Sequence, residues 1–176
     1  MGRAIAKIDA FEVPVKPKTT FNVGRVGGGT SVNAIPFEAW MEVDMRSADK
    51  ASLEALNAKY KAAVQEAIDE ENKRWKGRGP VSVSNELVGY RPAGETPPDS
   101  PIVTTAIEVN KLFGASTNLG EGSTDSNVPM NLGIPAITIG GGGQGSGAHA
   151  LDESFNTKDS YRGTQRGIVL AIALAR

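Results

Sequence analysis

Apolar and polar side chains alternate along residues 37–46, FEAWMEVDMR. Read in steps of two, one set of positions is apolar, and the other set is mostly charged and ends at Arg46. A period of two is typical of a strand with one buried face, and we predict this strand over residues 35–46. An earlier strand is predicted over residues 19–26, and the glycines at 27–29 separate the two.

Apolar side chains at helical spacing predict two helices beside these strands. The first is short and covers the apolar positions from Ala4 to Phe11. The second follows an N-cap at Ser47 or Asp49 and carries an apolar stripe over residues 53–75, opposite a charged side. We therefore expect a long amphipathic helix on the surface of a small sheet.

Glycines and a proline at residues 77–80 end the long helix, and residues 81–90 predict a further strand with Val81 and Val83 turned inward. The order helix, strand, strand, helix, strand predicts an α+β sandwich with two helices on one face of an antiparallel sheet. This order is one strand short of the ferredoxin-like, split βαβ arrangement. The missing strand would precede residue 1.

The second half of the chain begins with a proline-rich link, RPAGETPP at residues 91–98, which indicates a change of domain. Helices are predicted over residues 100–113, with proline at the first helical position, and over residues 159–175. Strands are predicted over residues 116–119 and 134–139. Two strands do not make a stable sheet, so we interpret this half as part of a larger α/β domain.

Composition narrows the class of protein. The chain has 176 residues, a formal net charge of −1 from 19 basic and 20 acidic residues, and no cysteine. The mixed charge gives no basic surface for nucleic acid, and no apolar run approaches the length of a membrane span. Without cysteine there is neither a disulfide framework nor thiolate chemistry, and we expect a cytoplasmic protein.

The candidate chemistry lies between residues 120 and 155. Glycines crowd residues 140–147, but no Gly-Lys-Ser/Thr follows and no helix begins directly after them, which argues against a phosphate-binding loop. The run favours close backbone approach to another segment, with a floppy loop as the alternative. His149 follows, and it is the one histidine of the chain. A metal site needs three or four ligands, so one histidine without cysteine would need Asp, Glu or residues from elsewhere to complete it.

Ser123, Thr124 and Asp125 form the other polar cluster of this half. A triad of Ser123, His149 and Asp125 is conceivable, but the Gly-x-Ser-x-Gly pattern of a nucleophile elbow does not surround Ser123. We favour Asp125 as the cap of a short helical turn and Thr124 as a polar contact.

Two stretches together resemble the M20 family of metallopeptidases and amidohydrolases, which includes acetylornithine and succinyl-diaminopimelate deacylases, glutamate carboxypeptidases and tripeptidases. NVGRVGGGTSVNAIPFEAWMEVDMRS, residues 22–47, resembles the lid or dimerisation domain of that family. GSTDSNVPMNLGIPAITIGGGGQGSGAHALDESF, residues 122–155, resembles its C-terminal catalytic segment. The resemblance implies a truncated lid over residues 1–93 and the last part of a catalytic α/β domain over residues 94–176.

The resemblance also implies roles for individual residues. Asn33 and Arg46 would reach the substrate, often across a dimer, and Arg46 suits a two-pronged grip on a carboxylate. The alternative for Arg46 is an ion pair with Asp44 or Glu42 on its own face. His149 would bind one zinc ion, with Glu153 beside it in a supporting role. Thr124 and the backbone of Gly141, Gly142 and Gly143 would line the same pocket from the side of the catalytic domain.

The other family ligands and the general base would lie in an N-terminal half that this sequence does not show. The resemblance therefore implies part of a zinc-dependent hydrolase of amide or peptide bonds, with two zinc ions in the complete enzyme. Its substrates would be small peptides or N-acyl amino acids that bear a carboxylate, and its lid would form a homodimer. We expect this chain alone to retain no zinc and to be inactive. The alternatives are a non-catalytic dimerisation module and a serine hydrolase that uses Ser123.

Overall fold

The computed structural model describes residues 1–175. The chain divides into two compact units, the first covering Met1–Tyr90 and the second beginning at Arg91. Each unit is described by itself below. No helix among the described residues is long and apolar enough to cross a membrane.

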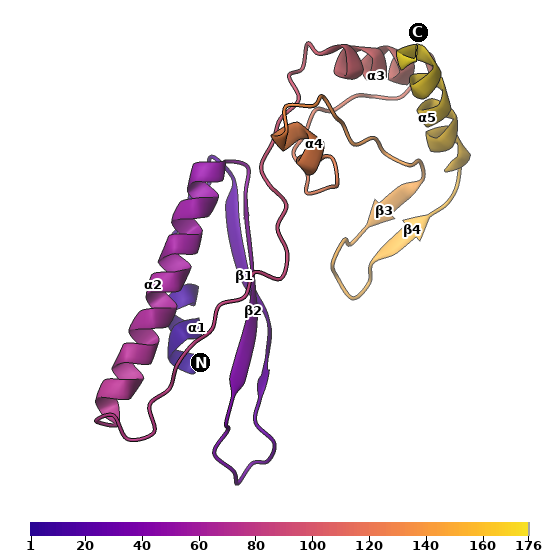
Figure 1. Ribbon diagram of the computed structural model, residues 1–176. Coiled ribbons are helices and arrows are strands. Elements are labelled where there is room, and N and C mark those ends of the chain that lie inside the picture. The colour runs from indigo at the N-terminus through magenta and orange to yellow at the C-terminus, as the bar shows by residue number, and fades with distance from the viewer. Residues whose placement is uncertain (176) are drawn as a thin grey trace. The chain divides into compact units, whose positions relative to one another are not determined.

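The first unit is built on an antiparallel pair of strands, β1 (Thr19–Gly28) and β2 (Ala39–Ser47). Two helices, α1 (Gly2–Asp9) and α2 (Lys50–Arg74), cover one face of this pair (Figure 1). The strand pair and both helices confirm the elements that the sequence predicts. β2 begins four residues later than predicted, at Ala39, because the chain before it turns at residues 31–34 and closes on Gly29.

The core of this unit lies between the two helices and the inner face of the strands. Ile8 is 1% exposed and is the most deeply buried side chain of the cluster. It packs with Ala4 of the same helix and with Val64 and Ala67 of α2. Alternate strand positions close the cluster from below, namely Phe21, Val23, Met41 and Val43. The period of two therefore places Met41 and Val43, the central apolar positions of β2, against the helices, whereas Phe37, before the strand begins, is exposed.

A β-bulge at Gly24 interrupts the register of β1. Val23 pairs with Val43, but the next pair joins Arg25 to Glu42, so Gly24 is the extra residue. An extra residue moves all following side chains of the strand to the opposite face. The bulge therefore puts Arg25 on the outer face of the sheet, which the helices do not cover.

α2 begins and ends at local signals. Asp49 is its N-cap, and its Oδ2 accepts a hydrogen bond from the backbone N–H of Ser52 at 2.7 Å. This backbone hydrogen bond lowers the pKa of the Asp49 carboxyl below its ordinary value. Past the last turn, Gly77 has a φ of 72°, a left-handed conformation that glycine adopts without strain.

The predicted strand over residues 81–90 is wrong. This segment pairs with neither strand of the sheet, and Val81 and Val83 are 44% and 40% exposed rather than inward. The side chain of Asn72 bonds both backbone groups of Val81: its Oδ1 accepts from the Val81 N–H at 2.8 Å, and its Nδ2 donates to the Val81 carbonyl at 3.0 Å. The sheet in the described part of the first unit thus has two strands, and the ferredoxin-like arrangement is not confirmed.

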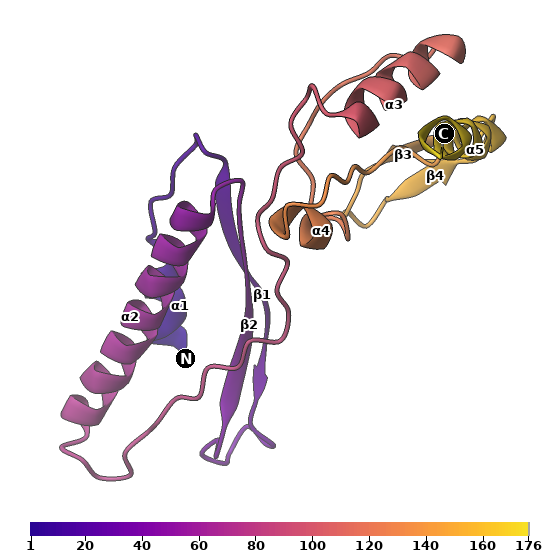
Figure 2. The ribbon, with the colours of Figure 1, turned by 45° about the horizontal axis from the view of Figure 1, so that its top comes forward.

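The second unit contains α3 (Pro101–Leu112), the short α4 (Asn127–Asn131) and α5 (Tyr161–Leu174). The helices over residues 100–113 and 159–175 are confirmed, with Ser100 at the N-cap and Pro101 at the first position of α3. A small antiparallel hairpin, β3 (Gln144–Ser146) and β4 (Ser154–Asn156), lies in the glycine-rich region (Figure 2).

The strands predicted over residues 116–119 and 134–139 are wrong. Ile134 and Ile139 are 55% and 42% exposed, so the second segment is not a buried strand. Its backbone is held by a side chain instead: the Thr96 hydroxyl donates to the carbonyl of Ala136 at 2.5 Å and accepts from its N–H at 3.0 Å. A segment that satisfies its backbone groups in this way has no need of a strand partner.

Candidate functional site

Arg46 lies at the end of β2, on the outer face of the sheet. It pairs across the strands with Thr20, and both its side chain and that of Asp44 are more than half exposed. The Arg46 Nε donates a hydrogen bond to Asp44 Oδ2 at 2.6 Å. The structure thus contains the intrastrand ion pair that the sequence offered as the alternative to a substrate contact, and this pair uses the Nε of an accessible guanidinium.

Asn33 lies in the loop between β1 and β2, at the other end of the hairpin from Arg46. Its Oδ1 accepts a hydrogen bond from the Ser31 hydroxyl within the loop. β2 runs from Ala39 to beyond Arg46, and seven strand steps span about 24 Å. One small ligand therefore cannot contact Asn33 and Arg46 of the same chain.

The outer face between these two residues carries a cluster that the sequence pattern does not reveal. Arg25 Nη1 donates to both carboxylate oxygens of Glu42 at 3.0 Å, and its guanidinium lies 5.3 Å from the Trp40 ring centroid. The Trp40 ring lies across Gly27, where an added Cβ would come within 2.5 Å of it. The bulge at Gly24 creates this cluster because it turns Arg25 to the outer face. A bulge cannot be predicted from the alternation of apolar and polar residues.

Thr124 lies three residues before the start of α4, where its side chain connects two segments of the second unit. Its Oγ1 lies 2.7 Å from the Thr138 hydroxyl, which also lies 2.8 Å from the Ser126 hydroxyl. The polar contact predicted for Thr124 is present. The predicted cap is wrong, because Ser126 occupies the N-cap of α4 while the Asp125 carboxylate lies 3.4 Å from an Arg91 nitrogen.

The glycines at 141–143 approach other segments closely. A Cβ at Gly142, whose φ is 88°, would collide with the backbone of Ser160. A Cβ at Gly143 would come within 2.6 Å of the Phe155 ring. The run therefore packs against β4 and the start of α5. Arg166 ties it in place by donating to the Gly140 carbonyl and to Asn110 Oδ1 of α3, both at 3.1 Å.

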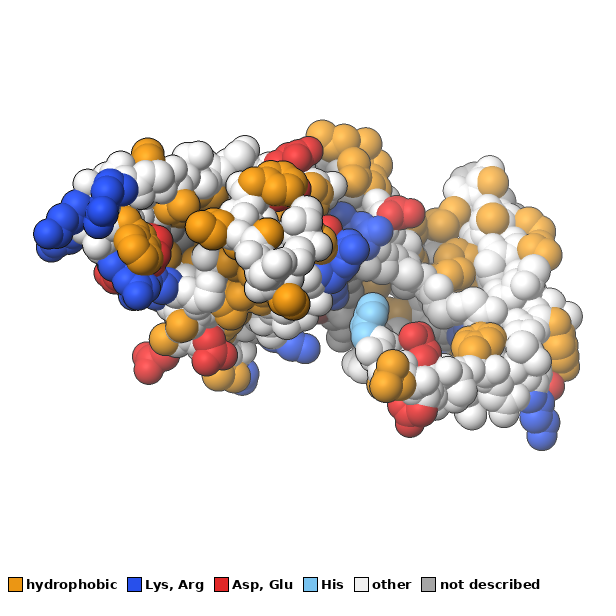
Figure 3. All heavy atoms as spheres, turned by 90° about the horizontal axis from the view of Figure 1, so that it is seen from below, with side chains coloured by type: hydrophobic (Ala, Val, Ile, Leu, Met, Phe, Trp, Pro, Cys, Tyr) orange, Lys and Arg blue, Asp and Glu red, His pale blue; other side chains and the backbone are white. Residues whose placement is uncertain are grey.

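His149 is exposed in the turn between β3 and β4 (Figure 3). Its φ of 68° is in the left-handed region, and its backbone N–H donates to Glu153 Oε2 at 3.3 Å. Residues 1–175 contain no group of three His, Cys, Asp or Glu side chains placed to hold a metal ion. Because a zinc ion in a protein takes at least three such ligands, the described residues alone do not fit one.

A serine triad is not assembled in the second unit. Arg91 contacts both Ser123 and Asp125 at 3.4 Å, while the hydrogen bond found at His149 goes to Glu153. In the part of the chain that the structure describes, no hydrogen bond joins His149 to Ser123 or Asp125. The proton transfer that a triad requires has no path here.

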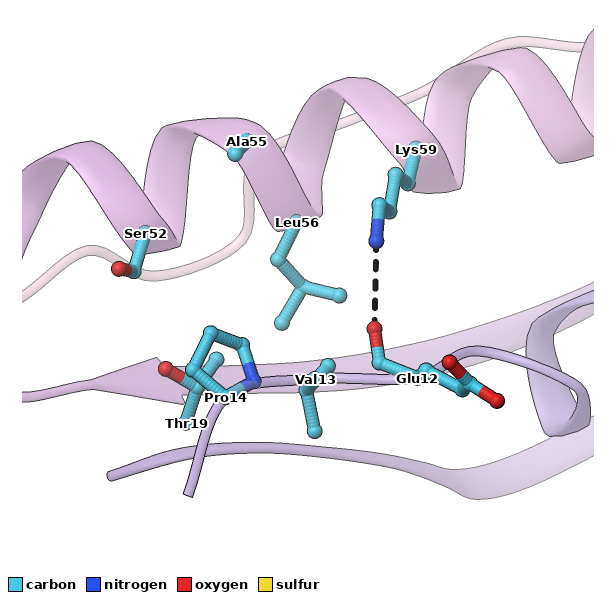
Figure 4. Close-up of a pocket in the computed structure, with 8 residues that line it drawn as sticks. All are labelled: Glu12, Val13, Pro14, Thr19, Ser52, Ala55, Leu56 and Lys59. Carbon is cyan, nitrogen blue, oxygen red and sulfur yellow. Dashed lines mark hydrogen bonds between the residues drawn. The ribbon is translucent and has the colours of Figure 1, made fainter. Parts of the chain in front are cut away.

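An apolar cleft opens in the first unit, between α2 and the segment that leads into β1 (Figure 4). It has a volume of about 130 Å³ and includes Val13, Pro14 and Leu56 in its lining. Lys59 spans one side by donating from Nζ to the Glu12 carbonyl at 3.2 Å. Its lining lacks a catalytic arrangement, so it is a place to receive an apolar group.

Comparison with known proteins gives a solved structure of similar fold and a matching family model. In fold, the chain resembles a peptidase, the aminopeptidase PepT from Bacillus cereus, with a TM-score of 0.64 and 23% identity. The match covers 98% of this chain and 45% of that one. Residues 1–72 match the peptidase dimerisation domain of the M20 family.

Curated relatives agree with this family. Acetylornithine deacetylase from Klebsiella pneumoniae is 32% identical over 148 residues, which is 84% of this chain and 36% of the relative. The same enzyme from Pectobacterium carotovorum is 30% identical over 142 residues, or 81% and 34% respectively. Residues 1–72 therefore belong to the peptidase dimerisation domain family of M20 enzymes, and the chain spans about a third of the length of these relatives.

Proposed function

We propose that this chain is the dimerising and substrate-contacting part of an M20-type hydrolase of amide or peptide bonds. The observation that carries the proposal is the match of residues 1–72 to a peptidase dimerisation domain, a match that includes both Asn33 and Arg46. The first unit would pair with a second copy, and residues 94–176 would contribute to the catalytic domain.

The outer face of β2 supplies the chemistry of substrate contact. Arg46 is accessible there, and a guanidinium is suited to a carboxylate because it offers parallel N–H groups. The substrates would be small peptides or N-acyl amino acids with a free carboxylate. Since Asn33 lies about 24 Å or more from Arg46 along the hairpin, the two would contact one ligand only when they come from different copies.

We do not propose a complete zinc site among the described residues. His149 would be one ligand of a metal centre whose other ligands lie outside residues 1–175, since three suitable side chains do not meet within this range. Glu153 would orient the turn through its contact with the His149 backbone. Thr124 and the backbone of Gly141, Gly142 and Gly143 would face the substrate from the same side.

The experiment combines a mass measurement with an activity assay. The full chain is examined by sedimentation velocity, and its hydrolysis of N-acetyl amino acids and dipeptides is measured with and without added zinc. The proposal expects a dimer without zinc-dependent hydrolysis. A monomer at all concentrations, or zinc-dependent turnover that His149→Ala removes, would contradict it.

A serine-based hydrolase is the other function that the sequence suggests, and the geometry does not favour it. Ser123 and Asp125 both contact Arg91, whereas the hydrogen bond found at His149 goes to Glu153. Hydrolysis that a serine-directed reagent abolishes and that chelators do not affect would support the serine-based function instead.

A further inference from the structure

The tip of the β1–β2 hairpin, residues 29–38, presents three large apolar side chains to solvent. Val32, Ile35 and Phe37 are 108%, 97% and 78% exposed. The tip is held in shape by backbone hydrogen bonds, from Gly29 N–H to the Glu38 carbonyl at 3.2 Å and within the turn at residues 31–34. Large apolar side chains gathered on an ordered projection mark an interaction surface.

The cleft of the first unit has the size for one such side chain. Figure 4 shows Leu56 pointing from α2 toward Val13 and Pro14, with Thr19 beside them. Its volume is about 130 Å³, and a cavity of about 150 Å³ holds a benzene ring. The ring of Phe37 is therefore of a size that the cleft can receive.

The tip and the cleft lie at opposite ends of the same hairpin. Thr19, which lines the cleft, is the first residue of β1, and the tip follows its last residue, Gly28. Nine strand steps separate the two by about 30 Å. A chain cannot fill its own cleft with its own tip, but two copies with antiparallel hairpins place each tip at the cleft of the other. A two-fold axis makes this contact twice.

Charge does not oppose this contact. Glu38 is the one charged residue of the tip, and residues 26–45 contain no Lys or Arg. The lining of the cleft holds one cation and one carboxylate, Lys59 and Glu12, and the Asp49 carboxylate accepts a hydrogen bond from Ser52 of that lining. The contact proposed below is therefore chiefly apolar.

We propose that the hairpin tip of one copy docks in the Leu56–Pro14 cleft of a second copy, with Phe37 as the side chain that fills it. This inference rests on the dimerisation proposed above and specifies which surfaces meet. The same arrangement brings Asn33 of one copy toward the end of the hairpin that carries Arg46 of the other.

The first test compares two serine variants of the full chain by sedimentation velocity. Phe37→Ser removes the docking side chain, and we expect it to raise the dimer dissociation constant about 100-fold, because each dimer loses two central apolar contacts. Leu151→Ser is the matched control, since Leu151 is an even more exposed apolar residue of the second unit, and the dimer should keep its affinity. Equal effects of the two variants would overturn the inference.

The second test uses the absence of cysteine from the sequence. Ala34→Cys in the tip is combined with Ala55→Cys at the cleft, and a short bismaleimide should link two chains covalently. The control pairs Ala34→Cys with Ala62→Cys, which lies about 10.5 Å further along α2 and should give little product. A wild-type dimer without a specific 34–55 cross-link would overturn the docking but keep the dimer, whereas a wild-type monomer would overturn both.

Discussion

Arg46 Nε donates a hydrogen bond to Asp44 Oδ2 at 2.6 Å, two positions away on the same face of β2. Both side chains are more than half exposed, so the pair is accessible to solutes. Any carboxylate that binds Arg46 must therefore compete with a carboxylate that is already present. Asp44 sets how strongly the outer face of the sheet attracts an anion.

Removing this competitor should strengthen anion binding. We expect Asp44→Asn to increase the affinity of the chain for an N-acetyl amino acid about two- to fivefold, which corresponds to the modest free energy of an exposed ion pair. The measurement is an NMR titration that follows the Arg46 side-chain N–H signals. Glu42→Gln is the control, because Glu42 pairs with Arg25 on the same face. Equal shifts in both variants would show that net charge alone, rather than the Arg46 pair, controls binding.

The contact between α1 and α2 should respond to acid. Lys7 and Arg3 of α1 contact Glu70 and Glu71 of α2 at 2.9 and 3.0 Å. The hydrogen bond from Lys7 lowers the pKa of Glu70, and those from Trp75 and then Arg3 lower that of Glu71. A lowered folded-state pKa means that the stabilisation is present above the unfolded value of 4.5 and is lost as the pH falls through the folded value.

Chemical denaturation at a series of pH values measures this dependence. We expect Glu70→Gln to flatten the loss of stability below pH 4.5, because the variant no longer binds a proton on unfolding there. Glu54→Gln is the control, since that carboxylate lies 4.0 Å from Lys50 of its own helix and does not touch α1. A steeper acid limb in Glu70→Gln would contradict the prediction.

Ile8 is the most deeply buried side chain of the contact between α1 and α2. Ile8 is 1% exposed between the helices, so Ile8→Ala should lower the free energy of unfolding by about 2–5 kcal/mol, and Ile8→Val by about 1 kcal/mol. Urea denaturation measures both, and hydrogen exchange should show that α1 loses protection first. Val15→Ala, at a residue 86% exposed, should leave the stability unchanged. Similar losses at Ile8 and Val15 would refute the packing of α1.

Two glycines of α5 should respond to alanine in opposite ways. A Cβ at Gly163 would collide with the Gly141 backbone, whereas at Gly167 the nearest atom is Ile139 Cδ1 at 3.8 Å. We expect Gly163→Ala to destabilise the protein by about 1–3 kcal/mol, since backbone must move. Gly167→Ala should stabilise it by about 0.5–1 kcal/mol through helix propensity. Thermal unfolding of both variants tests the pair, and the same sign for both would contradict the packing of α5 on the glycine run.

Helices with local end signals could be predicted from the sequence. Asp49 caps α2 and Ser100 with Pro101 begins α3, where the residue types alone indicate a helix start. Isolated strands could not be predicted, because a strand exists only with a partner. Asn72 and Thr96 instead bind the backbone of Val81 and Ala136.

The candidate site shows the same limit. Arg46 on the outer face follows from the period of two, and the structure confirms its exposure. Its separation from Asn33 depends on the length of the hairpin, and the neighbours of His149 depend on tertiary structure, so residue types alone could not supply either. The Arg25–Trp40 contact depends on the bulge at Gly24, which the alternation of apolar and polar residues does not indicate.

Native mass spectrometry of the full chain in the presence of zinc tests the central claim most directly, because one spectrum reports both subunit number and metal content. The account predicts a dimer of 18.4 kDa chains whose His149→Ala variant gives the same spectrum, without a pair of tightly bound zinc ions in each chain. A monomer, or two zinc ions per chain that disappear in His149→Ala, would contradict it.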